Sequence, residues 1–238
     1  MTQAPVLAVL GQFGDAIQFI FQERESTTGG AQVGGGQIWG LLVDHIWLSA
    51  IAMAIACAIA IPLGLVLGHT GRFGFLAINL SNIGRAVPTL ALVAVFVAYL
   101  GVGLLNVTVA LTLLAIPPIL TNTYVGVQQV DREIVDAATG QGLTGGQVLR
   151  SIELPLALPL MMDGIRISTV NVIATAALAP LAGASSLGDP IVSYGVYGDT
   201  GRLAGSIMVA VLAISADLGL AALGRAVTPR GLRLAPTS

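Results

Sequence analysis

Long apolar runs without charge alternate with short polar connections along this chain, and they predict membrane-spanning helices. A helix that crosses about 30 Å of hydrocarbon needs about 20 mostly apolar residues. Residues 46–68 carry no charged side chain, and neither do residues 86–130. The second run is too long for one helix. Its Gly101-Val102-Gly103 sequence, together with Asn106, predicts an external turn between two antiparallel helices.

Five spans follow from this pattern. The helix before the turn is expected to begin near Phe75 with a break before Pro88, and the helix after it is flexed by Pro117 and Pro118. The predicted spans cover residues 46–68, from about 75 to the turn, about 107–125, 167–187 and 203–224.

The N-terminal part of the chain is less apolar. Residues 5–22 form a short apolar run that includes Gln12 and Asp15, which predicts an interfacial or partly inserted helix, with a sixth span as the alternative. Residues 26–36 are rich in glycine and predict a flexible linker, and residues 38–44 predict a short helix at the membrane surface. The expected domains are therefore an N-terminal segment, a transmembrane domain and a tail, at residues 1–45, 46–227 and 228–238.

Composition narrows the class of protein. Of the 238 residues, 55% are hydrophobic and only 9% are charged, against about 25% charged in soluble domains. The mean hydropathy is +0.89. A net charge of −2 argues against a nucleic-acid partner, and the single Cys57 excludes an internal disulfide or a multi-cysteine metal cluster. His45 and His69 are isolated in the sequence and are expected at the membrane interface rather than on a metal. We therefore expect an all-α integral membrane protein without a metal site.

Arginine placement predicts the orientation, because cytoplasmic loops of membrane proteins are enriched in Lys and Arg. With five spans, the first connection, the third connection and the tail lie on the same side of the membrane. These regions hold most of the arginines, namely Arg72, Arg132, Arg150, Arg225, Arg230 and Arg233. This side is expected to be cytoplasmic, and the C-terminus with it.

The one long polar connection, residues 128–158, is predicted to be folded rather than slack. Asp131–Thr139 can form a short helix that ends at two glycines, Gly140 and Gly142. Thr144 and Gln147 then have capping-box spacing, which predicts a second short helix that Pro155 closes. Such a compact knob is expected to press against a partner.

The same loop resembles the EAA loop of the permeases of ATP-binding-cassette importers, which have the MetI-like fold. The matching positions are Asp136-Ala137-Ala138, Gly142 and Ile152-Glu153-Leu154-Pro155, with aspartate in place of the usual glutamate at position 136. The resemblance implies a coupling helix that docks on an ATPase subunit. The residues that it assigns to ATPase coupling are Asp136, Ala137, Ala138, Gly142, Ile152, Leu154 and Pro155.

Further positions are similar to the glycine betaine/carnitine/choline osmoprotectant permeases. They include Asn122-Thr123, Gly164-Ile165-Arg166 and the run from Gly183 to Asp189, where Ser185 and Ser186 replace the usual glycines. Methionine importer permeases share another part of the pattern, matched by Asn82, Arg85 and Pro88. The resemblance implies a bacterial inner-membrane permease for a quaternary-ammonium osmoprotectant, or alternatively for an amino acid such as methionine. An autonomous secondary carrier or channel, and a non-transporting scaffold, remain as alternatives of another class.

The resemblance also implies partners. They are two ATPase subunits that carry ATP and Mg²⁺, a second permease subunit (identical or paralogous), an extracytoplasmic solute-binding protein and membrane lipid. Without lysine the chain cannot form a Gly-x-x-x-x-Gly-Lys phosphate loop, so it is not expected to be an enzyme or to hold a cofactor itself.

Three charged residues, Arg85, Arg166 and Asp217, fall at or within the predicted spans. A charge at the centre of a membrane helix costs about 2.5–3.5 kcal/mol, so it is expected to be paired or near water. We expect Asp217 to pair with Arg166 or Arg85 and to fix packing near an inner gate. Arginines that reach for lipid phosphates are the alternative.

Overall fold

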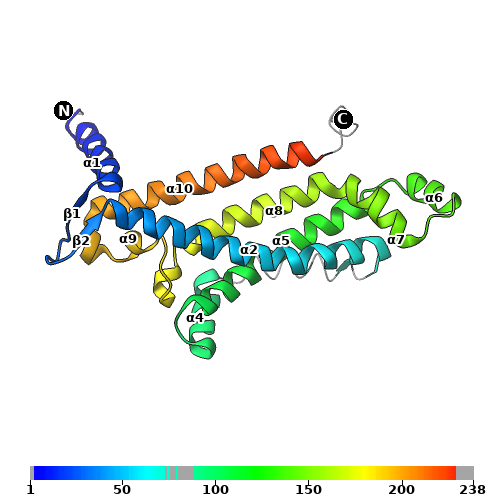
Figure 1. The fold of residues 1–238 in the computed structure, drawn as a ribbon, viewed down its shortest axis with the longest axis horizontal. Coiled ribbons are helices and arrows are strands. Elements are labelled where there is room, and N and C mark those ends of the chain that lie inside the picture. Colours follow the sequence, from blue (N-terminus) through cyan, green and yellow to red (C-terminus); the bar gives the residue numbers. More distant parts are fainter. Residues whose placement is uncertain (1–2, 73, 76–78, 80–87, 229–238) are drawn as a thin grey trace. The chain divides into compact units, whose positions relative to one another are not determined.

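The computed structural model describes residues 3–72, 74–75, 79 and 88–228, and Figure 1 shows the elements in chain order. Arg85, Asn82 and the chain just before Pro88 lie outside the described residues, as does nearly all of the predicted tail. The chain forms two compact units. One comprises Met1–Ile51, Thr89–Leu111 and Val172–Ile214, and the other Ala52–Pro88, Thr112–Asn171 and Ser215–Ser238.

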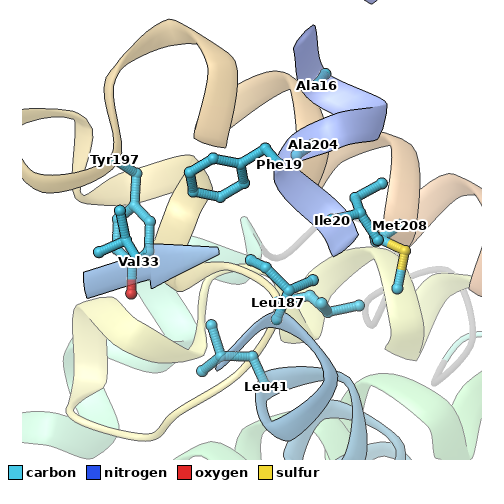
Figure 2. Packing of buried hydrophobic residues seen from close by; sticks show 10 residues of the cluster. Ala16, Phe19, Ile20, Val33, Leu41, Leu187, Tyr197, Ala204 and Met208 are labelled. Atoms are coloured by element: carbon cyan, nitrogen blue, oxygen red, sulfur yellow. The ribbon is translucent and has the colours of Figure 1, made fainter. Parts of the chain in front are cut away.

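The first unit begins with helix α1 (Gln3–Phe21) and two short antiparallel strands, β1 (Glu23–Glu25) and β2 (Gln32–Gly34). Its core is a cluster of buried side chains from α1, β2, the start of α2 (Gly36–Thr70), Leu187 and the start of α10 (Tyr194–Val227) (Figure 2). Phe19 and Tyr197 meet edge to face with ring centroids 6.5 Å apart. Complete burial of a side chain such as Phe19 contributes about 1.5–3 kcal/mol where the alternative is exposure to water.

The prediction of a flexible linker at residues 26–36 was wrong, because this segment includes strand β2 and is fixed to α10. Ser26 Oγ donates a hydrogen bond to the Val196 carbonyl at 3.0 Å, and Thr27 N donates to the same oxygen at 3.2 Å. Gly34 has a φ of +93°, and a Cβ there would lie 2.6 Å from the Gln22 carbonyl oxygen. The glycines therefore allow two backbone segments to pack closely. A glycine-rich composition is common to such close packing and to flexible linkers, so composition alone cannot distinguish them.

Helix α2 is continuous from Gly36 to Thr70, so the separate surface helix predicted at residues 38–44 does not exist. Its residue His45 was predicted to be interfacial, but it is completely buried, and its Nε2 lies 3.0 Å from the Ile173 carbonyl oxygen. The polar Asp44 and His45 interrupt the apolar pattern without interrupting the helix.

The turn predicted at Gly101–Gly103 is confirmed. Helix α4 (Thr89–Leu100) ends before it and α5 (Leu104–Gln128) begins after it. Gly101 and Gly103 have φ values of +78° and +135°, which favour glycine. Asn106 Nδ2 donates to the Gly101 carbonyl at 2.9 Å, so the predicted contribution of Asn106 to the turn is also confirmed. Pro117 and Pro118 lie inside helix α5.

The fourth predicted span was misplaced. Helix α8 covers Leu154–Ala176 rather than residues 167–187, and the chain after it forms a short 3-10 turn, η2 (Ala179–Ala182), and a single-turn helix, α9 (Asp189–Val192). Asp163 and Arg166 obscured its start, because they place charges inside an apolar helix. Helix α10 starts at Tyr194 instead of residue 203 and is kinked at Gly198.

Within the part of the chain that the structure describes, four helices are long and apolar enough to cross a membrane: Gly36–Thr70, Leu104–Gln128, Gly145–Ala176 and Tyr194–Val227. Helix α4 is apolar but has only 12 residues, and α1 is not among the four. The all-α membrane fold is confirmed, whereas the count of five or six spans stays a prediction.

Candidate functional site

The polar connection after α5 folds as predicted into helix α6 (Arg132–Gly140), within the second unit. Asp131 caps its N-terminus, because Asp131 Oδ1 accepts a hydrogen bond from Glu133 N at 2.9 Å. Ala138 is buried, whereas Asp136 and Ala137 are exposed. The two residues that the sequence motif places first therefore lie on the outer surface of the loop.

The end of α6 is fixed by a Schellman motif. Leu143 N donates to the Ala138 carbonyl at 3.3 Å, and Gly142 N donates to the Thr139 carbonyl at 2.9 Å. Gly142 occupies the left-handed position that this motif requires, with a φ of +89°. A Cβ at Gly142 would meet no other atom within 4 Å, so backbone conformation rather than space favours glycine here.

The left-handed turn at Gly142 forms an elbow in the loop. A second helical turn, α7 (Gly145–Val148), follows this elbow. The predicted cap is present in part, since Thr144 N donates to Gln147 Oε1 at 2.8 Å. Pro155 does not close this helix, contrary to the sequence prediction. The chain continues through one π-helical turn, η1 (Leu149–Glu153), directly into α8. Pro155 lacks an N–H, and the π turn just before it accommodates the missing i→i−4 hydrogen bond.

A hydrogen bond between His69 and Glu153 joins the base of the loop to the end of α2. His69 Nδ1 lies 2.6 Å from Glu153 Oε2, and the two side chains are 28% and 6% exposed. A Cβ at Gly145 would lie 3.1 Å from His69 Nε2, so α7 also approaches this ring closely. His69 was predicted to be an isolated interfacial residue. Sequence spacing could not pair it with a carboxylate 84 positions away.

Small residues bring the helices of this unit together near the loop. A Cβ at Gly64 would lie 2.7 Å from Thr123 Cβ, and one at Gly68 would lie 2.6 Å from Val127 Cβ. Such close approach of backbones is the usual mode of packing between membrane helices. The end of α2 is thus held by α5 on one side and by Glu153 on another.

The prediction that Asp217 pairs with Arg166 or Arg85 is confirmed for Arg166. Arg166 Nε donates to Asp217 Oδ1 at 3.0 Å, and Arg166 Nη2 donates to Asp217 Oδ2 at 3.1 Å, in a bidentate geometry. Arg166 Nη1 also lies 3.4 Å from Asp163 Oδ1. Sequence reasoning did not single out Asp163, although its spacing of three residues from Arg166 on a helix is a recognisable signal.

These charged groups line a cleft of about 500 Å³ within the second unit. Five of the lining residues belong to α8 at helical spacing, so they share one face of that helix. The lining residues are Asn122, Asp163, Arg166, Ile167, Val170, Asn171 and Asp217.

The predicted external motif, residues 183–189, lies in the first unit and is mostly buried. Ser186 is completely buried, and its Oγ donates to the Ala176 carbonyl at 2.8 Å and accepts from Gly188 N at 2.9 Å. Asp189 Oδ2 accepts from Ser186 N at 2.9 Å. Burial raises the pKa of the Asp189 carboxyl, and the Ser186 N–H opposes that change. This segment is therefore held by its own hydrogen bonds.

Comparisons with known proteins agree with this geometry. The family model described as "Binding-protein-dependent transport system inner membrane component" matches residues 60–229. The glycine betaine/carnitine/choline transport system permease protein OpuCB of Bacillus subtilis (strain 168) is 37% identical over 203 residues, which cover 85% of this chain and 94% of that protein. The carnitine transport permease protein OpuCB of Listeria monocytogenes is 35% identical over 220 residues, 92% of this chain and 96% of that one.

A solved structure shares the fold. The inward-facing MetNI methionine ABC transporter matches with a TM-score of 0.72 and 22% sequence identity, over 82% of this chain and 100% of that chain. At this identity the likeness concerns the arrangement of helices alone.

Proposed function

Because the chain belongs to the family of binding-protein-dependent transport system inner membrane components, we propose that it is the permease subunit of an ATP-driven importer for a quaternary-ammonium osmoprotectant. As a permease of this family it is a membrane subunit and not an enzyme, and ATP hydrolysis resides in a separate subunit. The observation that carries the substrate class is the set of relatives named for glycine betaine, carnitine and choline, at 35–38% identity over most of the chain.

The loop from Asp131 to Glu153 is proposed as the point where the ATPase acts. Asp136 and Ala137 are exposed on α6, where a small side chain permits close contact and a carboxylate accepts charge-assisted hydrogen bonds. Gly142 fixes the angle between α6 and α7. When two ATPase subunits close on ATP and Mg²⁺, they would draw two such loops together and tilt the spans between inward- and outward-facing states.

The remaining residues of the motif are proposed to transmit that motion. Ile152 lies in the π turn, and Leu154 and Pro155 form the first turn of α8, so no flexible segment separates the docking helix from the span. The pair of Arg166 with Asp217 would hold α8 to α10 near an inner gate. Arg85 is proposed as a third gate residue on its position in the sequence alone.

The assembly that we propose contains a second permease subunit, an extracytoplasmic solute-binding protein and a cytoplasmic C-terminus. The arginine distribution supports this orientation in the bacterial inner membrane. A large part of the substrate selectivity is then expected to reside in the binding protein.

Uptake into proteoliposomes tests the proposal. The chain would be reconstituted with the ATPase subunit, the second permease and the binding protein of its proposed assembly. We expect ATP-dependent uptake of at least one of labelled glycine betaine, carnitine and choline. Uptake of methionine alone would show that the substrate is an amino acid and not a quaternary-ammonium osmoprotectant. Uptake that persists without the ATPase subunit would contradict the permease assignment.

A further inference from the structure

The two histidines of the chain both lie on α2, and they contact opposite ends of the α8 segment. His45 Nε2 lies 3.0 Å from the Ile173 carbonyl oxygen, within the first unit. His69 Nδ1 lies 2.6 Å from Glu153 Oε2, within the second unit. The first histidine thus meets the last turn of α8, and the second meets the π turn that leads into α8. Because α2 and α8 are each one continuous helix, the two contacts join the same pair of helices.

The contact of His45 satisfies a group that α8 cannot satisfy by itself. The last four carbonyls of a helix have no partner further along that helix, and Ile173 lies in the last turn of α8. A carbonyl oxygen only accepts, so His45 Nε2 carries the hydrogen and donates it. His45 is completely buried, so its loss would remove a hydrogen bond at a place where water cannot replace the donor.

The contact of His69 joins α2 to the proposed docking loop. The Glu153 side chain is only 6% exposed, and the His69 ring also lies close to α7, since a Cβ at Gly145 would be 3.1 Å from His69 Nε2. Glu153 ends the π turn, and α8 begins at the next residue, Leu154. A displacement of the loop at residues 131–153 would therefore reach α8 along the backbone and α2 through His69.

Each of the two helices can bend by itself, and contacts at both ends oppose that. Pro62 lies inside α2 and Pro159 inside α8, and each proline removes one backbone hydrogen bond from its helix. At a rise of about 1.5 Å per residue, the two histidine contacts lie about 36 Å apart along α2 and about 30 Å apart along the α8 segment. Two contacts at this spacing make one helix follow when the other tilts, whereas a single contact would act as a pivot.

We propose that His45 and His69 are positioning residues for transport, which clamp α2 to α8 so that both helices move as one body when the loop at residues 131–153 moves. The inference rests on the proposed function, in which the ATPase acts on that loop. It adds α2 to the part of the permease that moves with the loop. Histidine suits both positions, because a neutral imidazole can donate a hydrogen bond without placing a charge in the protein interior.

The amount of osmolyte taken up per ATP hydrolysed tests the clamp in proteoliposomes that contain the full complex. His45→Leu and His69→Leu each remove the donor and keep an apolar side chain. We expect each variant to lower this ratio about fivefold, because ATP hydrolysis continues while α2 no longer follows α8. A loss of folded protein alone would lower uptake and hydrolysis together and leave the ratio unchanged. His45→Gln and His69→Asn are the matched controls, since each restores an amide N–H donor, and their ratios should stay within about twofold of the wild-type ratio.

A cross-link tests whether the two helices move together. His69→Cys and Glu153→Cys would be combined in a Cys57→Ala background and joined by a short bifunctional methanethiosulfonate. This covalent link should restore most of the ratio that the two substitutions remove, and a reducing agent should reverse the gain. Uptake abolished by the cross-link would show that α2 must move against α8, and it would overturn the inference, as would wild-type ratios in both leucine variants. A wild-type complex without ATP-dependent uptake of any of the three osmolytes would refute the proposed function, and the inference with it.

Discussion

Two segments of this chain carry family motifs, and the structure treats them in opposite ways. The proposed coupling loop (residues 131–153) exposes Asp136, Ala137 and Gly142, whereas the predicted outer motif (residues 183–189) buries Ser186 and Leu187 completely. The outer motif is held by its own hydrogen bonds to Ala176 and Asp189. A sequence motif can therefore mark either a surface that contacts a partner or a segment that the fold requires. Whether its side chains are exposed or buried distinguishes these two cases.

The largest expected effect on stability is at the outer motif. A Cβ on Gly188 would lie 1.9 Å from the Ala177 carbonyl oxygen, so Gly188→Ala forces the backbone apart. We expect a loss of about 3 kcal/mol in the free energy of unfolding. Gly195→Ala is the matched control, because a Cβ there meets nothing within 4 Å. Thermal unfolding in detergent measures both variants, and equal melting temperatures would contradict the assignment of this motif to the core.

The next effect is at the base of the coupling loop. His69→Ala leaves the Glu153 carboxylate buried without its partner and should cost about 2 kcal/mol of stability. Adding Glu153→Gln removes the buried charge, so the double variant should recover most of the loss. A double variant no more stable than His69→Ala, measured by the same unfolding assay, would show that the pair does not hold the base.

A smaller effect is expected at the elbow. Gly142→Ala places a Cβ at a φ of +89° and should cost about 1–2 kcal/mol locally, with reduced ATP-dependent uptake. Gly146→Ala lies in α7, meets nothing within 4 Å and should be neutral or slightly stabilising. If both variants transport equally well, the elbow angle has no role in coupling.

Sequence alone predicted the parts of this molecule that depend on local signals. The turn at Gly101 and the end of α6 at Gly142 both follow from residue types that act within one turn of chain. The pairing of Arg166 with Asp217 was also predictable, because an unpaired charge inside a span is costly.

The errors came from tertiary context. The glycines at residues 29–36 suggested a flexible linker, but this segment forms a tight hairpin that is hydrogen-bonded to α10. Asp163 and Arg166 hid the start of α8, and Pro155 suggested an end where a π turn lets the helix continue. The pair of His69 with Glu153 depends on contact between distant segments, which no local spacing reveals.

The most direct test of the account uses an exposed residue of the coupling loop. Ala138 is buried, so its substitution would confuse folding with docking, whereas Ala137 is exposed. We expect Ala137→Glu to change the unfolding free energy by less than about 0.5 kcal/mol. The same variant should abolish co-purification of the ATPase subunit, while Ala31→Glu, an exposed alanine of the first unit, should retain it. An Ala137→Glu chain that still co-purifies the ATPase and supports wild-type uptake would contradict the claim that the ATPase acts through this loop.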